Sequence, residues 1–513
     1  MKARPAFFYI SFLAISAVFL ISWFITPIWW VYIILLPLFL IGLSDVSQSR
    51  QAIRRNFPVI GHGRYLLESI RPEIMQYFVE TDTEGRPINR IFRSLVYQRA
   101  KSVIDTTPFG TQMDVYNAGY EWMEHSMYPK RFEEMDHNPT VTIGGSACKV
   151  PYESSVLNIS AMSFGSLSKN AILALNGGAK DGNFAHNTGE GAISPYHREP
   201  GGDLIWQIGT GYFGCRDEDG NFSADLFKEK ASDDQVKMIE IKMSQGAKPG
   251  HGGILPAEKN TPEIAEIRHV KVGTTVFSPP FHTAFSNPTE LMQFIQQLRE
   301  LSGGKPVGFK LCVGNKSEFR ELCEAMLATG IRPDFITVDG AEGGTGAAPV
   351  EFSNSLGMPL RDGLAYVHDT LKGFGLREEV KILASGKIIS AFHMIRAMAL
   401  GADVCYSARA MMMAVGCIQA LQCNTNTCPT GVATQDKTLM KGLDPRNKRQ
   451  RVANFHKNTL DAFVEMLGAA GLNSSREIRR KHILRRVSMN EVKSYAELYP
   501  VMTKGALLKE AIS

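Results

Sequence analysis

The sequence predicts an α/β protein: a (β/α)8 TIM barrel preceded by a two-helix transmembrane hairpin and followed by a helical C-terminal extension. From about residue 156 to 413, short runs rich in Val and Ile alternate with amphipathic segments. Polar or glycine-rich residues follow nearly every such run, as a ring of loops around one barrel mouth requires. The first forty residues are instead almost continuously apolar.

Each predicted strand of the barrel is an apolar run that ends in a loop. The strands lie in VLNISAMSFG, IEIKMSQGAKPG, VGFKLCVG, DFITVDGAEGGTG, VKILASGK and ADVCYSARA. Amphipathic helices are expected between them, for example in SKNAILALNGGAKDG and NPTELMQFIQQLREL. Repeated strand–helix units imply a parallel sheet, and a doubly wound open sheet is the alternative. LIWQIGTGYFGC, with Gly209, Gly211 and Gly214, is interpreted as a hairpin inserted in the barrel.

Four regions are expected along the chain. They are a transmembrane hairpin (1–45), a helical linker region (46–145), the barrel with its cysteines (146–440) and a helical extension (441–513). In the linker region, RYLLESIRPEIMQYF predicts a helix interrupted at Pro72. In the extension, a stripe of apolar residues predicts a packing helix, made by Leu460, Phe463, Met466 and Leu467. The basic segment SREIRRKHILRRV is interpreted as a solvated helix face, with a membrane-surface contact as the alternative.

Two apolar runs near the N-terminus, Ala6 to Ile25 and Pro27 to Leu43, each approach the length that crosses a bilayer. Basic residues precede the first run and follow the second, whereas the connection between them is uncharged. The positive-inside rule therefore places both ends in the cytoplasm. We expect a two-span protein of the cell membrane with a cytoplasmic catalytic domain. A cleavable signal peptide is the rival, but it leaves the second run unexplained.

The overall composition is that of a globular protein, with 44% hydrophobic and 21% charged residues. The net charge of +5 is small for 513 residues, and the basic residues are dispersed, so nothing indicates nucleic-acid binding. Eight cysteines without regular pairing fit a reducing compartment better than a secreted disulfide scaffold.

Three of these cysteines are clustered in GCIQALQCNTNTCPTGVATQ. Cys417, Cys423 and Cys428 are spaced C-x5-C-x4-C, and Pro429 follows the last. Three neighbouring thiolates can hold a soft metal centre. Zinc usually takes four protein ligands, or three and a water, whereas a cubane that lacks one iron needs only three. The alternative is three buried thiols without a ligand.

Three glycine-rich or basic loops follow consecutive late strands and predict a phosphate site. They are Gly343-Gly344-Thr345-Gly346, Ala384-Ser385-Gly386-Lys387 and Ser407-Ala408-Arg409. Glycine lets the backbone approach an anion closely, and the N–H groups of a turn can cradle a phosphate.

Charged residues at other strand ends predict a binding site for a second, smaller ligand. Lys242, Gln245 and Lys248 leave one strand, and two cations with an amide suit a dicarboxylate. Glu190 follows an earlier strand and could orient an ammonium or imine nitrogen. A surface network of ion pairs is the alternative. Lys310, at a strand's inner end, is a candidate Schiff-base nucleophile, phosphate partner or partner for an electron-rich ring.

With these motifs in order from about residue 150 to 436, the chain resembles the FMN-binding synthase domain of glutamate synthases. The matching segments are SAMSFGSLS, NTGEG, QIGTGYFG, IKMSQGAKPG, FSPPFH, GGTGAAP and CNTNTCPTGVATQ. In appearance the chain is most similar to short, membrane-anchored members that lack the other synthase domains.

The resemblance implies an oxidoreductase acting on CH–NH2 donors (EC 1.4) that reduces 2-iminoglutarate to L-glutamate. It implies FMN in the barrel mouth and a [3Fe-4S] cluster on Cys417, Cys423 and Cys428. Lys242 and Gln245 would face the substrate carboxylates, and Glu190 the reacting end. The residues implied to hold FMN are Ala161, Met162, Ser163, Gln207 and Lys310 around the ring, and Gly343, Gly344, Thr345, Gly346, Ser385, Gly386, Ala408 and Arg409 at the phosphate.

Several features depart from the complete enzymes. The first cysteine is Cys148, so we expect no glutamine hydrolysis by this chain and a nitrogen supply from ammonia, a partner amidotransferase subunit or another amine. We identify no G-x-G-x-x-G fingerprint after a strand in a βαβ setting and therefore no nicotinamide site, so electrons are expected from a ferredoxin or a partner flavoprotein. His251 stands where the larger enzymes carry an acidic residue. A flavin-dependent oxidoreductase or synthase acting on another amine or an N-substituted glutamate, and a non-catalytic electron-transfer subunit, remain alternatives.

Overall fold

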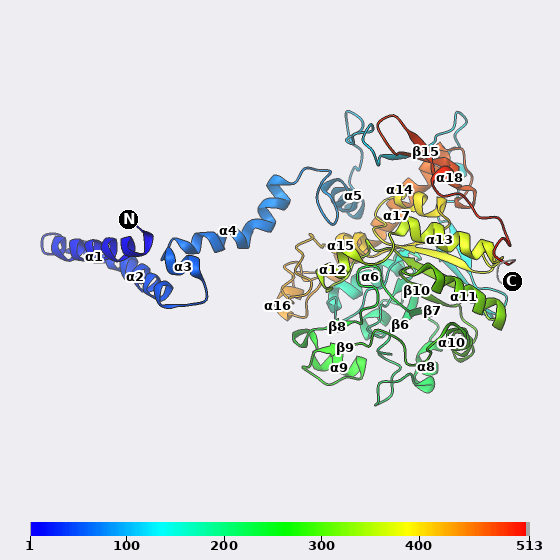
Figure 1. The fold of residues 1–513 in the computed structure, drawn as a ribbon, viewed down its shortest axis with the longest axis horizontal. Helices are drawn as coiled ribbons and strands as arrows, with labels where there is room; N and C mark the ends of the chain where they lie inside the picture. Colours follow the sequence, from blue (N-terminus) through cyan, green and yellow to red (C-terminus); the bar gives the residue numbers. More distant parts are fainter. Residues whose placement is uncertain (1, 509–513) are drawn as a thin grey trace. The chain divides into compact units, whose positions relative to one another are not determined.

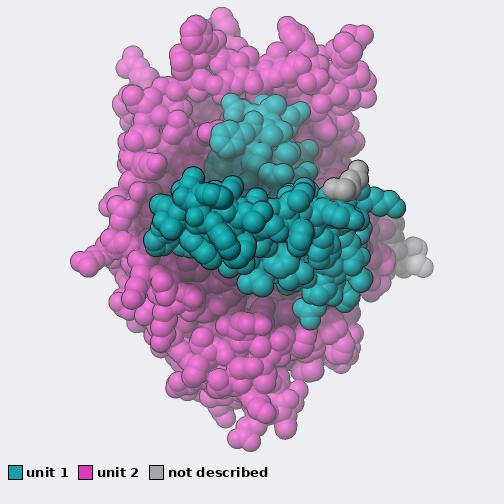
Figure 2. All heavy atoms as spheres, turned by 90° about the vertical axis from the view of Figure 1, so that its left-hand side faces the viewer, with its two compact units in different colours: residues 1–87 teal, residues 88–513 magenta. Residues whose placement is uncertain are grey.

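The computed structural model describes residues 2–508, which fall into two compact units, 1–87 and 88–513 (Figure 2). In residues 2–87, the regular elements that the structure describes are all helices. They are α1 (Ala3–Ser22), the 3-10 helix η1 (Thr26–Val31), α2 (Tyr32–Ser47), α3 (Ala52–Asn56), α4 (Gly61–Ile74) and the π-helix η2 (Met75–Val79).

Two helices of the first unit, Ala3–Ser22 and Thr26–Ser47, are long and apolar enough to cross a membrane, each with a mean hydropathy of 2.0. The predicted break between them lies at Thr26, where η1 begins. Near the end of α2, the buried carboxylate of Asp45 lies 2.8 Å from the His62 ring and accepts a bond from the Val59 N–H. The one acidic residue of these two helices is thus held by partners within the unit.

The predicted interruption at Pro72 is wrong. The α4 helix continues through Pro72 to Ile74 and leads directly into the π-helix. Proline removes one backbone donor, and a wider π turn accommodates such a local change in helical geometry.

The second unit contains a closed barrel of eight strands, all paired in parallel. This confirms the predicted fold class (Figure 1). The strands are β4 (Leu157–Ile159), β5 (His186–Asn187), β6 (Leu204–Ile208), β7 (Val236–Lys242), β10 (Val307–Leu311), β11 (Phe335–Asp339), β12 (Lys381–Ser385) and β13 (Val404–Ser407). Pairing of β13 with β4, through Cys405 and Leu157, closes the ring.

The segment interpreted as an inserted hairpin is instead a barrel strand. Residues Leu204–Ile208 form β6, which is buried along its whole length and pairs with β5 and β7. Trp206 packs on Phe227 of α8 (Ala224–Ala231), with ring centroids 5.1 Å apart. The three glycines that suggested a hairpin follow the strand, where the chain turns over the mouth.

Helices cover the outside of the barrel between successive strands. They include α6 (Lys169–Gly182), α10 (Pro288–Leu301), α11 (Lys316–Thr329), α13 (Leu360–Gly373), α14 (Ala391–Ala399) and α15 (Arg409–Val415). Two insertions lie on the loops. Between β7 and β10 come the hairpin β8 (Ile254–Leu255) and β9 (Val276–Phe277) with α9 (Pro262–Arg268), and between β11 and α13 comes α12 (Val350–Ser355).

The C-terminal part begins with α17 (Pro445–Ala469), which packs on α6 and on α5 (Arg90–Lys101). Leu460, Phe463 and Leu467 are buried in it, which confirms the predicted packing helix. The basic tail does not form the predicted helix face. Residues Ile483–Arg486 form β14, which pairs with β1 (Glu121–Met123) and β15 (Val492–Ser494), because Ile483 is buried against the core.

Candidate functional site at the barrel mouth

The carboxyl ends of the parallel strands meet at one mouth, and a small cleft, with a volume of about 10 Å³, opens there. Its lining comes from the loops after β5, β6 and β7 and from the following insertion. The lining residues are Glu190, Thr210, Lys242, Met243, Ser244, Gln245, Gly250, His251, Gly252, Gly253, Pro279 and Pro280. The three predicted substrate-side residues, Glu190, Lys242 and Gln245, are therefore brought together.

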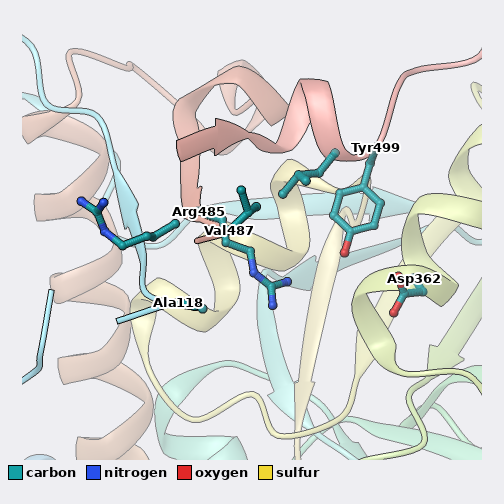
Figure 3. A pocket seen from close by; sticks show the side chains of 8 residues that line it. Ala118, Asp362, Arg485, Val487 and Tyr499 are labelled. Atoms are coloured by element: carbon teal, nitrogen blue, oxygen red, sulfur yellow. The ribbon is translucent and has the colours of Figure 1, made fainter. Parts of the chain in front are cut away.

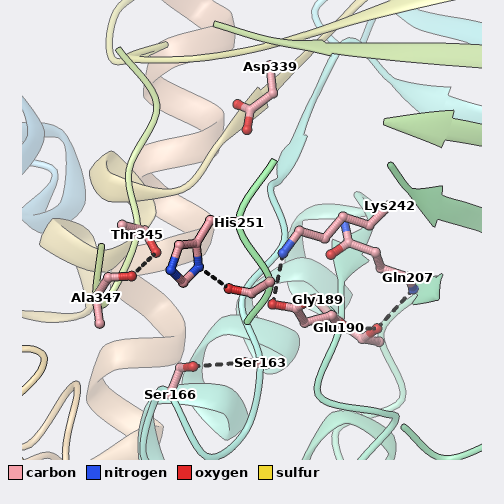
Figure 4. Close-up of polar contacts among 12 residues, drawn as sticks. Ser163, Ser166, Gly189, Glu190, Gln207, Lys242, His251, Asp339, Thr345 and Ala347 are labelled. Carbon is pink, nitrogen blue, oxygen red and sulfur yellow. Dashed lines mark hydrogen bonds and ion pairs between the residues drawn. The ribbon is translucent and has the colours of Figure 1, made fainter. Parts of the chain in front are cut away.

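One side of the cleft is lined by charged side chains and is called the charged wall below. At its centre Glu190 and Lys242 form an ion pair, with Nζ and Oε1 2.8 Å apart (Figure 4). Burial by itself would raise the pKa of Glu190. The attraction of Lys242, reinforced by Lys248 and Arg268, instead lowers that pKa to about 2. Glu190 is thus ionised at neutral pH and acts there as an acceptor of hydrogen bonds.

The cations of the wall are destabilised by burial and by one another. Burial lowers the pKa of Lys242, Glu190 opposes that effect, and Lys310 adds to it. Lys310 is the register partner of Lys242 on the neighbouring strand β10. Burial also lowers the pKa of Lys248 and brings that of Arg268 to about 10. This surplus of buried positive charge favours an anionic ligand.

Two residues that contribute to the wall were missed from the sequence. Arg268, the last residue of α9, donates from Nη2 to the Phe164 carbonyl at 2.9 Å. The His282 ring lies 2.9 Å from the Lys242 carbonyl and 3.1 Å from the Tyr212 hydroxyl, and burial lowers its pKa to about 4. His282 lies in the quoted FSPPFH segment, but no spacing signal placed Arg268 here, because the insertion carries it in from the side.

The predicted phosphate loops follow three adjacent strands, β11, β12 and β13. Arg409 donates to the Glu342 carbonyl at 2.6 Å, and a Cβ on Gly344 would lie only 2.9 Å from the Arg409 side chain. Gly340 N–H bonds the Ser385 carbonyl at 2.8 Å, and Gly386 has a φ of +137°. The structure thus brings the three loops into one continuous surface.

The residues predicted to line a flavin ring have mixed surroundings. Met162 follows β4, and its N–H bonds the Asn187 carbonyl at 3.1 Å. Gln207 donates to the buried Glu240 carboxylate at 2.6 Å, inside the barrel. Lys310 is buried, and its ammonium group makes no hydrogen bond or ion pair within residues 2–508. Its Nζ is not among the fully buried atoms, so the ammonium group is open to a bound anion or electron-rich ring.

The remaining predicted positions lie in the same loops. Ala161 and Ser163 flank Met162, and the Ser163 hydroxyl donates to that of Ser166 at 3.1 Å. Thr345 lies on the exposed glycine loop, where its hydroxyl bonds the Ala347 carbonyl at 3.3 Å. Ala408 precedes α15.

The three predicted metal-ligating cysteines influence each other electrostatically. Burial raises the pKa of Cys417 to about 12, with a further rise from Cys423 and Cys428. Hydrogen bonds from Thr430 and from nearby backbone groups lower the pKa of Cys428, although burial acts in the opposite direction. Lys259 donates to the Cys423 carbonyl at 2.8 Å, which places a cation beside the thiols. Within the described residues no three ligating side chains are arranged for a single metal ion.

The fold and this site define a class: a (β/α)8-barrel protein with a cation-rich cleft, an adjoining glycine-loop surface and a group of interacting thiols. A family model described as "Conserved region in glutamate synthase" matches residues 100–473. The glutamate synthase large subunit-like protein YerD of Bacillus subtilis is 39% identical over 496 residues, covering 88% of this chain and 94% of that protein.

Two further relatives carry glutamate synthase names. The archaeal NADPH glutamate synthase of Methanocaldococcus jannaschii is 38% identical over 339 residues, 65% of this chain and 62% of that protein. The archaeal-type enzyme of Thermotoga maritima is 36% identical over 334 residues, 64% of this chain and 62% of its own length. The chain belongs to the glutamate synthase family, and we describe it as a glutamate synthase-like oxidoreductase.

Proposed function

We propose that the protein is an FMN-dependent, iron–sulfur oxidoreductase of the EC 1.4 class that reduces 2-iminoglutarate, formed from 2-oxoglutarate and ammonia, to L-glutamate. The observation that carries this proposal is the buried Glu190–Lys242 pair, flanked by Lys248 and Arg268, in a cleft of a glutamate synthase-family barrel. The reaction adds two electrons and two protons to the carbon–nitrogen double bond.

The residues at the mouth fit FMN. The glycine surface after β11, β12 and β13 offers backbone N–H groups and Arg409 for a phosphate. The ammonium group of Lys310 makes no hydrogen bond or ion pair in the described chain and would stabilise negative charge on a reduced ring. Ala161, Met162, Ser163 and Gln207 are proposed to lie along the ring.

The cysteine loop fits a three-ligand cluster by the chemistry of its donors. Three thiols influence one another, N–H groups reach the sulfurs, as from Gln419 to Cys417 at 3.4 Å, and Lys259 supplies a neighbouring positive charge. Burial opposes the ionisation of Cys417 and Cys423, whereas the N–H group of Gln419 and the charge of Lys259 favour it. We propose that Cys417, Cys423 and Cys428 bind a [3Fe-4S] cluster that receives electrons from a ferredoxin or a flavoprotein.

When bound, the cluster would pass single electrons and FMN would deliver them to the imine carbon as a hydride. The residues of this chain position the substrate. Lys242 and Gln245 would bind its carboxylates, and the ionised Glu190 would accept a hydrogen bond from the iminium or ammonium nitrogen. Charges fixed before the substrate arrives need little reorganisation during the reaction.

We propose a division of labour along the chain to go with this chemistry. Residues 1–45 would anchor the protein as two membrane spans, 46–145 would link, 146–440 would catalyse and 441–513 would support the barrel. The support for an anchor is the length and hydropathy of the two N-terminal helices.

The test is anaerobic purification of the full chain, followed by flavin, iron and sulfide analysis and steady-state turnover of 2-oxoglutarate plus ammonia with a reduced dye. We expect one flavin, about three irons and glutamate formation. A protein without flavin bands would refute the oxidoreductase assignment for this chain, whereas flavin without turnover would refute only the substrate.

One observation favours a second candidate, a synthase or oxidoreductase for an N-substituted glutamate or another amine. The His251 ring lines the same cleft, edge-on to Phe352 with ring centroids 5.3 Å apart. A substituent on the substrate nitrogen would find an aromatic surface there. Flavin reduction by a panel of amines under argon would separate this candidate from the first.

A further inference from the structure

A second cavity, of about 510 Å³, lies between the β1–β14–β15 sheet and the first turn of α13 (Figure 3). It shares no lining residue with the cleft at the barrel mouth. Its polar lining consists of Asp362, Arg485, Arg486 and Tyr499, and Val487 and Leu498 add apolar surface. The volume is in the range of pockets that hold small organic ligands.

Positive charge exceeds negative charge around this cavity. The carboxylate of Glu121, 4% exposed, is shared by the guanidinium groups of Arg361 and Arg396, with Arg485 3.8 Å away. Arg486 bonds two backbone carbonyls and has no carboxylate partner within the described residues. Three guanidinium groups, those of Arg361, Arg396 and Arg485, therefore face two carboxylates, those of Glu121 and Asp362, whereas the Arg486 side chain points to the other face of β14. A concave site with such a surplus attracts anions.

The opposite end of the cavity has different chemistry. Tyr499 and Asp362 lie on the same side, across from Ala118 (Figure 3). Burial and the nearby Asp362 carboxylate raise the pKa of the Tyr499 hydroxyl, while Arg361 and Arg485 lower it. A hydroxyl and a carboxylate at this end can accept hydrogen bonds from a ligand.

We propose that this cavity binds a small organic anion that carries a hydrogen-bond donor at its other end, a chemistry shared by amino acids and nucleoside monophosphates. The anionic group would lie against Arg485, since a guanidinium fork binds carboxylate and phosphate oxygens well. The amine or hydroxyl group would lie against Asp362 and Tyr499.

A ligand in this position would contact the first turn of α13, next to the glycine-loop surface. The N–H of Leu360 bonds the Glu342 carboxylate at 2.9 Å, and the Glu342 carbonyl accepts the bond from Arg409. Asp362 thus lies two residues from a group that is tied directly to the glycine-loop surface.

The test is isothermal titration of the full-length protein in detergent with AMP, with L-aspartate and with inorganic phosphate. We expect one of the two organic probes, AMP or L-aspartate, to bind. The probe that binds shows whether the cavity takes a nucleotide or an amino acid. Arg485→Gln should then lower the affinity for the probe that binds by at least tenfold. Arg476→Gln, an exposed arginine in the same part of the chain, and Lys242→Met, in the barrel cleft, should leave its affinity unchanged.

Two further variants test the same site, so that the result does not depend on whether Arg485→Gln folds. Tyr499→Phe removes only a hydroxyl group and should lower the affinity for the probe severalfold. Asp362→Asn should raise the affinity for inorganic phosphate, because a repelling charge is lost, but lower the affinity for the donor-bearing probe. The absence of binding by both AMP and L-aspartate at millimolar concentration, or binding that none of these three substitutions changes, would overturn the proposal.

Discussion

The two sides of the barrel mouth are built in opposite ways. On the side that follows β5 and β7, Glu190 and Lys242 contact each other at 2.8 Å, and Lys248 and Arg268 add their charges to the same carboxylate. On the side that follows β11 to β13, the residues from Gly344 to Gly346 are exposed. Arg409, which lies against them, bonds a backbone carbonyl there.

This difference reflects what each side must do without a ligand. Buried charges are costly unless they are paired, so the charged wall contains its own counter-charge. Exposed glycine N–H groups are satisfied by water and can exchange it for a phosphate at little cost. We therefore expect substitutions in the wall to act on catalysis and those in the glycine loops to act on cofactor affinity.

The largest effect is expected from Lys242→Met. It leaves the Glu190 carboxylate without its nearest cation, so the pKa of Glu190 should rise from about 2. The substrate also loses a fixed charge. We expect kcat/KM for 2-oxoglutarate plus ammonia to fall by about 10²–10³-fold, measured with a reduced dye as donor.

Lys248→Met is the matched control for this prediction. Lys248 is a weaker influence on Glu190 than Lys242 is, so its loss should cost roughly tenfold less activity. Equal losses in the two variants would mean that the ion pair has no special role. Flavin content should be the same in both, because neither residue lies in the glycine loops.

The second prediction concerns the cysteines, which belong to neither side of the mouth. Cys428→Ala removes the thiol whose pKa is lowered by hydrogen bonds, and with it one of three proposed ligands. We expect iron and sulfide to fall to background while flavin is retained. Cys148→Ala, which changes a half-buried cysteine outside this loop, should keep its iron. Full iron content in Cys428→Ala would refute the cluster assignment.

The barrel, and the meeting of Glu190, Lys242 and Gln245 at its mouth, could be predicted because both depend on local signals. Apolar runs that end in glycine or charge mark the strands, and parallel strands bring their carboxyl ends together. Glu190 and Lys242 are 52 positions apart, yet each directly follows or ends a strand on the same sheet. Their ion pair follows from that topology.

The failures arose where tertiary contacts outweighed local pattern. The strand β6 is followed by glycines, which suggested a hairpin, but its register between β5 and β7 is set by the closed barrel. Four positively charged residues in SREIRRKH resembled a solvated helix, yet Arg480 is buried against Asp369 at 2.8 Å. Arg268 reaches the cleft only because the insertion folds back over the mouth.

The third prediction tests the glycine side. Gly344→Ala adds a Cβ that would lie 2.9 Å from the Arg409 side chain, so Arg409 must move away from its bond to Glu342. We expect FMN to bind about tenfold more weakly, a loss comparable to one charge-assisted hydrogen bond. Turnover at saturating FMN should change little.

Gly346→Ala adds the same atom to open space, with nothing within 4 Å, and should weaken FMN less. Fluorescence titration of the apoprotein measures both affinities. If kcat falls in Gly344→Ala while FMN affinity is kept, the proposed separation of cofactor and catalytic sides is wrong.

The smallest expected effect is on the pH dependence of the free energy of unfolding. It separates the contribution of the charged wall from that of the buried histidines of the barrel. Burial lowers the pKa of His197 to about 4 and that of His456, stacked on Phe184, to about 3. Unfolded histidines bind a proton below pH 6.5, whereas these remain neutral in the fold. The free energy of unfolding should thus fall as pH drops from 6.5 toward 4, by up to about 1.4 kcal/mol per pH unit for each histidine.

Glu190 adds nothing to this slope above pH 4.5, because it is ionised in both the folded and the unfolded state there. Its contribution is lost only as pH falls from about 4.5 toward 2. Denaturant unfolding of the full chain between pH 7.5 and 5 measures the slope, and His456→Gln should flatten it by the share of one histidine. If Glu190→Gln flattens the slope instead, the charged wall and not the buried histidines makes the fold sensitive to mild acid.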